Sequence, residues 1–393
     1  MIRNLRAAAA WLEEMDGWML SSVLALCLLG VVMVFNTGSF RPEALQTSSG
    51  HAYYLIKHLS RFGLGLLALI GLANFDYRVL RRSWINWGFL GVGMGLIAVT
   101  VLLPRSGLVE SRAACNRWVQ LPFMPVQPVE MLKVALVLFL ADRCGEGYSR
   151  LRRRPGRLAW TIAIPLLAAL LLALQPNYGN ALVMILITAA IFFLAGLPSR
   201  IVVLLGGGAA SAAVIGFFCI DKIHNRVVLW WAGLSGQGSS YHVEQSLIGI
   251  GAGGWHGFGF GASHQRFWFL PESHTDFIFS VLGEELGLIG GLLTLAFFSI
   301  FALRGFRIAR MAGDRFGRLT AAGLTAMIST YAAINIAMVT GVVPVMGLPL
   351  PFVSYGGSAL VTNLAAVGIL LSIDRRGRQF RALRERAPRL GGA

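Results

Sequence analysis

The feature that most constrains the fold of this chain is its series of apolar runs, each suited to cross a lipid bilayer as a helix. A helix of about 20 apolar residues spans the hydrocarbon core. Seven runs carry no charged residue: 18–35, 84–103, 158–174, 181–197, 201–220, 319–343 and 358–373. Three further runs contain charged residues: 55–74, 129–141 and 277–303. The pattern predicts an all-α polytopic membrane protein with about ten transmembrane helices.

The composition excludes a soluble globular protein of this size. The chain has 393 residues, of which 56% are hydrophobic and 13% are charged, whereas soluble domains carry about 25% charged residues. A net charge of +16 could also indicate a nucleic-acid partner. Most of the 34 Lys and Arg residues, however, lie at the two ends and in alternate loops. This is the bias of the positive-inside rule, so we expect both termini in the cytoplasm and no nucleic-acid partner.

The chain shows no boundary between domains, and we expect one integral membrane domain over residues 1–393. Its parts are a cytoplasmic N-terminus at 1–17, a large extracytoplasmic loop at 221–276 before the eighth helix, and a basic cytoplasmic tail at 374–393. The large loop is rich in glycine and aromatic residues. This composition argues against disorder and favours a segment that lies on the membrane or folds back into the protein.

The stretch LPESHTDFIF places Asp276 at the outer entry to the eighth run. One interpretation is structural: Thr275 or Asp276 accepts hydrogen bonds from the first free backbone amides of the following helix. The other is functional: a partly desolvated carboxylate at the membrane–water boundary acts as a general base. Both can hold together, because a cap also fixes the position of the side chain.

Charged residues inside the apolar runs are costly, at about 2.5–3.5 kcal/mol each on insertion, and they indicate ion pairs or cavities. Glu130 and Lys133 are three residues apart, on one helical face, and can pair. Alternatively, Lys133 faces an anionic group of a substrate. Glu284 and Glu285 are adjacent and point in different directions on a helix. For these two we expect structural pairing, with a polar cavity or direct catalysis as the alternatives.

Two loop motifs add candidates at the outer face. Arg117 and Trp118 in NRWVQL lie at headgroup level, where Trp can be a membrane-belt residue, or where the pair can contact a sugar and a phosphate. In GLPLPFVSYGGSA, prolines break the helix, and Gly356–Gly357 permit close backbone approach before the last run. A helix starting after Ser354 offers free amides to an anion; a simple re-entrant turn is the alternative.

These motifs together closely resemble the SEDS family (shape, elongation, division and sporulation). The resemblance rests on LPESHTDFIFSVLGEELGLIGG and GLPLPFVSYGGSALVTNLAAVGILLSI, with QPVEMLK, NRWV, QPNYGNAL and QSLIGIGAGGWHGFGFGASHQRFWFLPE in the same order. It covers nearly the whole chain, and it implies a single SEDS-type domain of ten membrane helices. The implied activity is that of a peptidoglycan glycosyltransferase, which polymerises lipid II at the outer face of the bacterial cytoplasmic membrane. The pattern Ser263–Arg266 is more typical of the FtsW branch and VSYGGSA of the RodA branch; we favour FtsW.

The resemblance also implies partners and site residues. The partner is a class B penicillin-binding protein, which supplies transpeptidation, with other divisome or elongasome membrane proteins around it. Asp276 is the essential carboxylate in this comparison. The expected substrate-binding residues come from the matched motifs and are Arg117, Trp118, Glu130, Lys133, Gln245, Arg266, Glu272, His274, Ser354, Tyr355, Gly356 and Gly357. One departure is Asn177, at a position where the family often has an aspartate.

The mechanism that we expect is a direct displacement. Asp276 removes the proton from the sugar 4-hydroxyl of an incoming lipid II, and that oxygen attacks the anomeric carbon of the chain held on the second lipid carrier, with inversion. Positive charge stabilises the leaving diphosphate; the candidates are Lys133, Arg117, Arg266 or a divalent cation, and no other cofactor is indicated. A lipid II flippase or transporter is one alternative, since it also needs buried charges. A non-catalytic scaffold for the penicillin-binding protein is the other.

Overall fold

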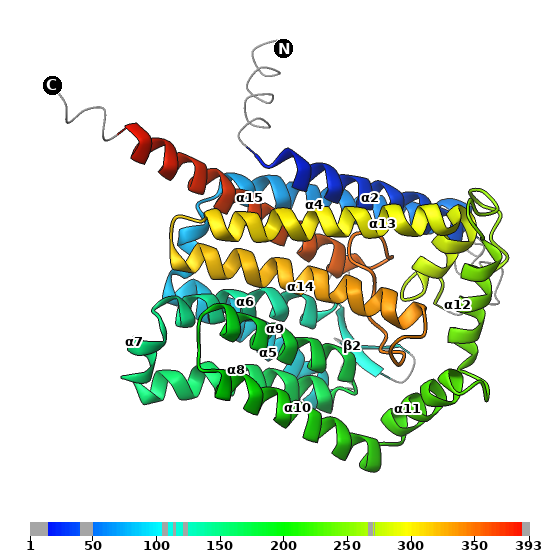
Figure 1. Ribbon diagram of the computed structural model, residues 1–393, viewed down its shortest axis with the longest axis horizontal. Helices are drawn as coiled ribbons and strands as arrows, with labels where there is room; N and C mark the ends of the chain where they lie inside the picture. The colour runs from blue at the N-terminus through cyan, green and yellow to red at the C-terminus, as the bar shows by residue number, and fades with distance from the viewer. Residues whose placement is uncertain are drawn as a thin grey trace, which may run out of the picture.

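The computed structural model describes residues 15–39, 50–103, 109–112, 115–120, 125–265, 270 and 272–386. Within these residues, long helices lie side by side and form a bundle (Figure 1). They are α2 (Gly17–Gly38), α4 (Tyr53–Asn74), α5 (Ser83–Leu102), α6 (Pro128–Gly145), α8 (Pro155–Leu174), α9 (Tyr178–Leu194), α10 (Ser199–Cys219), α13 (Ile278–Met311), α14 (Arg315–Val339) and α15 (Gly357–Arg386). The shorter helices are α7 (Tyr148–Arg152), α11 (Asp221–Leu234), α12 (Tyr241–Ala252), η1 (Gly50–Ala52) and η2 (Tyr77–Arg81). The predicted all-α polytopic fold class is confirmed.

Eight of the described helices are long and apolar enough to cross a membrane. The other two predicted runs fall on α6 and α9. α6 contains Glu130, Lys133, Asp142 and Arg143, which lower its hydropathy, and α9 is only 17 residues long. Every predicted run therefore falls on a helix, while the crossing of the membrane by α6 and α9 stays a prediction.

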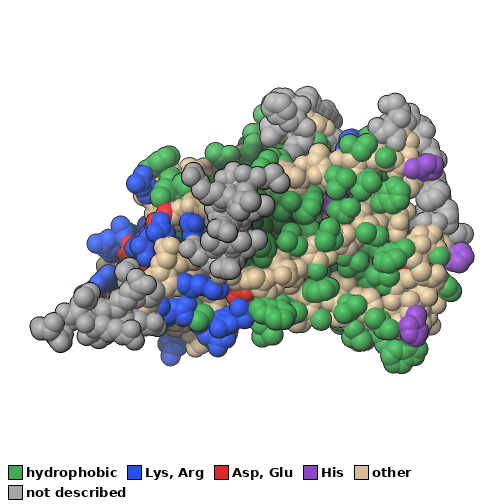
Figure 2. All heavy atoms as spheres, turned by 90° about the horizontal axis from the view of Figure 1, so that it is seen from above, with side chains coloured by type: hydrophobic (Ala, Val, Ile, Leu, Met, Phe, Trp, Pro, Cys, Tyr) green, Lys and Arg blue, Asp and Glu red, His purple; other side chains and the backbone are tan. Residues whose placement is uncertain are grey.

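Charge divides the bundle into two ends. Lys and Arg side chains gather at one end, which we call the basic end, and hydrophobic side chains cover the middle of the molecule (Figure 2). The basic end contains the arginine-rich segments 78–82, 143–157, 304–318 and 375–381. α2 begins at this end, where Asp16 pairs with Arg304. Because positive loops stay in the cytoplasm, we place the basic end there and refer to the opposite end as the outer end.

A small antiparallel sheet, which the sequence did not predict, lies between α5 and α6. Its strands are β1 (Val109–Arg112), β2 (Cys115–Gln120) and β3 (Pro125–Val126), in that order. Val119 of β2 pairs with Val109 on one side and with Val126 on the other. The sheet leads directly into α6 and fixes where that helix starts.

The outer segment 221–276 contains two helices, α11 and α12, which the sequence analysis did not predict. α12 packs against α13 and α14: the Ser246 hydroxyl donates to the Val339 carbonyl (2.7 Å), and the Ser280 hydroxyl donates to the Ser246 carbonyl (2.9 Å). Of the two expected arrangements, lying on the membrane or folding back, the contacts of α12 correspond to folding back.

The glycine-rich part of this segment pairs with a break in α13. Gly287 has non-helical angles (φ 65°, ψ −163°), so the backbone groups around it are not all used within the helix. Residues 254–259 supply the missing partners through four backbone hydrogen bonds: Phe258 N to Glu284 O (3.1 Å), Gly259 N to Glu285 O (2.9 Å), Leu288 N to Gly254 O (2.9 Å) and Ile289 N to Trp255 O (3.2 Å). Irregular backbone is tolerated at membrane depth only when such groups are paired inside the protein.

This contact explains why the segment needs glycine. A Cβ at Gly253 would lie 2.0 Å from the Gly283 carbonyl oxygen, and one at Gly257 would lie 2.2 Å from the Glu285 carbonyl oxygen. Side chains at these positions would push the segment away from α13 and leave the broken helix without its partners.

We therefore expect Gly253→Ala to lower the free energy of unfolding by about 1–3 kcal/mol, the usual cost of overpacking. Gly251 lies in the same stretch, but a Cβ there meets nothing within 4 Å, so Gly251→Ala is the matched control and should unfold like the wild type. Thermal unfolding of the purified variants in one detergent measures both. Equal melting temperatures for the two variants would contradict the proposed close contact.

Candidate functional site

Asp276 lies in a tight turn directly before α13. Glu272 starts the turn with a left-handed backbone (φ 56°), and its carbonyl accepts hydrogen bonds from the amides of Thr275 (3.1 Å) and Phe277 (3.3 Å). The Thr275 hydroxyl also donates to the Glu272 carboxylate (2.7 Å). The N-cap of α13 is Phe277, and no side chain caps this helix. The capping interpretation of Thr275 or Asp276 was therefore wrong, and Asp276 is held by the turn instead.

Asn335 of α14 anchors Asp276 to the segment that precedes α15. Its side-chain amide donates to the Asp276 carbonyl (2.8 Å) and to the Leu348 carbonyl (2.6 Å). The Asp276 carboxylate itself lies beside Gly347, where a Cβ would stand 3.4 Å from Oδ2. Gly347 has a φ of 71°, a backbone conformation that favours glycine.

Two further bonds join the same turn to the predicted motif at 347–359. The Ser354 hydroxyl donates to the Thr275 carbonyl (2.6 Å) and accepts from the Leu350 amide (2.8 Å). The Tyr355 amide donates to the His274 carbonyl (2.9 Å). The two motifs that the sequence singled out are thus in direct contact, although about 80 residues separate them.

α4 adds residues that the sequence analysis missed. Tyr54 packs edge-on against the rings of His274 (5.3 Å between centroids) and Tyr355 (5.0 Å). Arg61 lies with its guanidinium over the Tyr355 ring (4.9 Å), and it fills the space beside Gly357, where a Cβ would stand 2.7 Å from its Cζ. A positive charge therefore lies at the start of α15, whose free amides also favour an anion.

The electrostatics around Asp276 suit a proton acceptor. The side chain is half-buried. Burial raises the pKa of Asp276 from its ordinary value of 3.8 to about 7, and the negative charge of Glu272 adds to the rise. The positive charges of Arg117 and Arg226 act in the opposite direction. The carboxylate is therefore basic enough to accept a proton near neutral pH and is still reachable from solvent.

Arg117 and Trp118 lie on β2, at the edge of this region. The Arg117 guanidinium donates to the Pro176 carbonyl, which fixes it toward the start of α9.

Asn177, where the family often has an aspartate, is satisfied by hydrogen bonds to other side-chain amides. Its Nδ2 donates to Gln175 Oε1 (3.5 Å), and its Oδ1 accepts from Asn180 Nδ2 (2.8 Å). Asn177 is buried among these amides.

Glu130 and Lys133 form the buried ion pair that the sequence allowed. The Lys133 amine lies 2.7 Å from the Glu130 carboxylate, and both side chains are 2% exposed. The amine also lies 3.9 Å from the centre of the Tyr331 ring. Lys133 and Tyr331 line a small cavity together with Pro349–Phe352, Ser354 and Gly356. The Lys133 end of the pair therefore lies next to the motif at 347–359.

The remaining predicted residues have other surroundings. Gln245 of α12 accepts a hydrogen bond from Gln265 (3.2 Å), and Gly356 lines the same small cavity as Lys133. Arg266 lies outside the described residues. Glu284 is buried and accepts from the amides of His264 (2.9 Å) and Gln265 (3.2 Å).

Glu284 and Glu285 are both held by hydrogen bonds within the protein, from backbone amides and an asparagine side chain and, within the part of the chain that the structure describes, not from Lys or Arg. Glu285 accepts from the Asn36 side chain of α2 (2.8 Å), so one glutamate holds the outer segment and the other holds a neighbouring helix. Among the residues with described positions, no group of three or more His, Cys, Asp or Glu side chains can hold a metal ion.

Comparison with known proteins covers almost the whole chain. The cell cycle protein family that groups FtsW, RodA and SpoVE matches residues 17–379. The probable peptidoglycan glycosyltransferase FtsW of Trichlorobacter lovleyi is 35% identical over 92% of this chain and 94% of its own length. Stage V sporulation protein E of Bacillus subtilis is 35% identical over 90% and 95%.

Solved structures share the fold. A protein from a peptidoglycan synthase complex, described as coordinating polymerization and crosslinking, superposes with a TM-score of 0.70 at 26% identity, over 93% of this chain and 99% of that chain. The rod shape determining protein RodA of Thermus thermophilus superposes with a TM-score of 0.66 at 26% identity, over 92% and 97%.

The buried ion pair generates a test. Lys133→Met should lower the free energy of unfolding by about 3–5 kcal/mol, because it leaves the Glu130 carboxylate buried without its partner. The double variant Glu130→Gln/Lys133→Met removes both charges and should recover much of this loss. Thermal unfolding in detergent compares the three proteins. A single variant as stable as the wild type would show that the pair is not buried as described.

Proposed function

The chain belongs to the cell cycle protein family of FtsW, RodA and SpoVE, and we propose that Asp276 is the general base of its peptidoglycan glycosyltransferase reaction. It is a multi-pass membrane protein. The proposed substrate is lipid II, used at the outer face of the bacterial cytoplasmic membrane. The observation that carries the assignment is a half-buried carboxylate at the outer end of the bundle with its pKa raised to about 7.

In this mechanism Asp276 takes the proton of the acceptor sugar's 4-hydroxyl while the oxygen attacks the anomeric carbon of the growing chain. The bond from that carbon to the lipid diphosphate breaks, and the diphosphate leaves with the electron pair. A base of pKa about 7 works well near neutral pH, because about half of it is deprotonated there and it still accepts a proton readily. Glu272 is exposed and bonded to Thr275, which supports one base and direct attack rather than a second carboxylate as nucleophile.

The structure changes which positive charges we assign to the leaving diphosphate. Lys133 is neutralised by Glu130 and covered by Tyr331, so its charge contributes little to an external anion. Arg117 acts electrostatically on Asp276, and Arg61 lies at the start of α15. We therefore assign the diphosphate to Arg61 and Arg117, with Arg266 as a further candidate. Gly356 is a candidate for close approach of the substrate to the backbone, whereas the space beside Gly357 is filled by the Arg61 guanidinium.

The contacts of the buried acids argue against the flippase alternative. A flippase would use buried charges to line a pathway for the lipid, whereas Glu130, Glu284 and Glu285 are each bonded to other groups of the protein. The polymerase is therefore the proposal favoured here. A class B penicillin-binding protein is the proposed partner, supported by the related protein found in a synthase complex. A role in division is supported by the FtsW and SpoVE relatives.

Removal of the base tests the assignment. Asp276→Asn keeps the size of the side chain and should reduce glycan strand formation from purified lipid II by at least about 10²-fold. Its melting temperature at pH 8 should be unchanged or higher, since burial disfavours the ionised carboxyl. Glu244→Gln changes an exposed acid of α12 and is the matched control with normal polymer. Normal polymer from Asp276→Asn would refute the role of the carboxylate.

The pH dependence gives a second test. The rate of polymerisation should rise with pH, with a midpoint of about 7, as the Asp276 carboxyl loses its proton. Glu272→Gln removes a negative charge that raises the pKa of Asp276, so the midpoint should move to lower pH; Arg226→Gln should move it to higher pH. Initial rates measured between pH 5 and 9 give this profile. A midpoint that neither variant moves would assign the titration to another group.

A further inference from the structure

A second polar cavity lies at the basic end, at the other end of the bundle from Asp276. Its volume is about 340 Å³. Three segments that are far apart in the sequence line it: the residue before α2, the end of α13 and the last part of α15. The charged side chains of its lining are Asp16, Arg304, Arg307, Asp374, Arg378 and Arg381.

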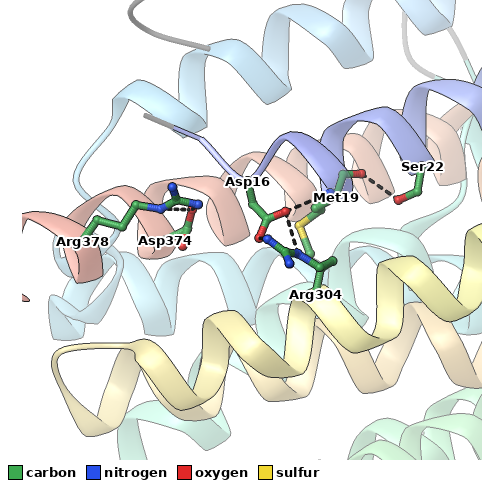
Figure 3. Close-up of polar contacts among 6 residues, drawn as sticks. All are labelled: Asp16, Met19, Ser22, Arg304, Asp374 and Arg378. Carbon is green, nitrogen blue, oxygen red and sulfur yellow. Dashed lines mark hydrogen bonds and ion pairs between the residues drawn. The ribbon is translucent and has the colours of Figure 1, made fainter. Parts of the chain in front are cut away.

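Two buried aspartates hold two of these arginines in fixed positions (Figure 3). Asp16 is 2% exposed; its carboxylate accepts from Arg304 Nε (2.8 Å) and lies 2.6 Å from Nη2 of the same guanidinium. Asp374 accepts from Arg378 Nε (2.9 Å) and lies 2.8 Å from its Nη2. Paired contacts of this kind fix the plane of a guanidinium. The cavity is therefore lined by pre-positioned donors.

The charges around the cavity do not balance. With Arg304 and Arg378 paired, Arg307 and Arg381 remain, and neither forms an ion pair with a carboxylate whose position is described. Arg381 donates only to the backbone carbonyl of Gly377 (3.3 Å). Two uncompensated positive charges around one cavity repel each other, and an anion between them would relieve the repulsion.

The level of the cavity indicates what kind of anion fits. On α13, Leu303 is 69% exposed and Phe306 is 36% exposed, so apolar side chains face outward right beside Arg304 and Arg307. The basic side chains adjoin the apolar surface of the bundle (Figure 2), and the lining of the cavity by Arg304 and Arg307 places it at this boundary, which is the level of lipid headgroups. Anionic lipids of the cytoplasmic leaflet attract basic residues at this level.

We propose that this cavity binds the phosphate of an anionic phospholipid from the cytoplasmic leaflet. Arg307 and Arg381 contact the phosphate oxygens, since guanidinium groups match phosphate geometry. The acyl chains lie against the exposed apolar face of α13. The bound phosphate joins α13 and α15, whose other ends adjoin Asp276 and Gly356, so the lipid restrains the two helices that position the site.

The test uses the full-length protein in detergent with phosphatidylglycerol as the probe. Native mass spectrometry of the wild type and of Arg307→Gln/Arg381→Gln measures the affinity for phosphatidylglycerol and, in parallel, for phosphatidylcholine. We expect the double variant to bind phosphatidylglycerol more weakly, by about fivefold for each arginine removed. Arg310→Gln alters an exposed arginine of α13 that does not line the cavity, and it should bind like the wild type.

Three results would overturn the proposal. The first is an unchanged affinity in the double variant. The second is an equal loss in Arg310→Gln, which would mean that basic residues act only through their general charge. The third comes from an arm with inorganic phosphate: tight binding of free phosphate that depends on Arg307 and Arg381, without preference for the lipid, would assign the cavity to a soluble anion. Asp16 and Arg304 are left intact in all variants, so folding of the α2–α13 contact is not at issue.

Discussion

The site around Asp276 depends on two hydrogen bonds from the side-chain amide of Asn335. It donates to the carbonyls of Asp276 and Leu348 at once, and so it joins the turn before α13 to the segment before α15. Ser354 repeats this link through its bond to the Thr275 carbonyl. Both links are made to backbone carbonyls, so they fix the position of the turn without involving the Asp276 carboxylate. That carboxylate is half-buried, forms no hydrogen bond with the described residues and can therefore take a proton.

The rest of the bundle follows from the cost of unpaired polar groups in an apolar medium. The break in α13 at Gly287 is tolerated because residues 254–259 pair with its backbone. Glu130 is neutralised by Lys133 within one helix, and Glu284 accepts amides from the outer segment. Glu130 and Glu284 therefore each have a partner that also joins them to another part of the protein. Asp276 differs from these acids, because burial and the negative charge of Glu272 raise the pKa of its carboxyl.

The sequence predicted the parts of the protein that depend on local pattern. The positions of the apolar runs, the Glu130–Lys133 pair and the two motifs around Asp276 and Gly357 could be read from composition and spacing. What it could not predict depends on tertiary contacts. Arg61 reaches the site only because α4 packs along α15, and nothing in its surrounding residues indicates that. The composition of the glycine-rich stretch favoured a segment that lies on the membrane or folds back, but the need for glycine at 253 and 257 follows from a break in α13 that the sequence did not reveal. Capping of α13 by Thr275 or Asp276 was one of the two interpretations of this motif, and it was wrong because the turn that starts at Glu272 uses these residues differently.

The proposed reaction requires the Asp276 carboxyl to meet the acceptor hydroxyl of the substrate. A structure of the Asp276→Asn variant with lipid II bound would show this contact. We expect the 4-hydroxyl of one bound sugar to lie within about 2.6–3.2 Å of the residue 276 side chain, the reach of a general base. A bound lipid II whose 4-hydroxyl lies beside a different acid, with residue 276 facing only protein, would contradict it.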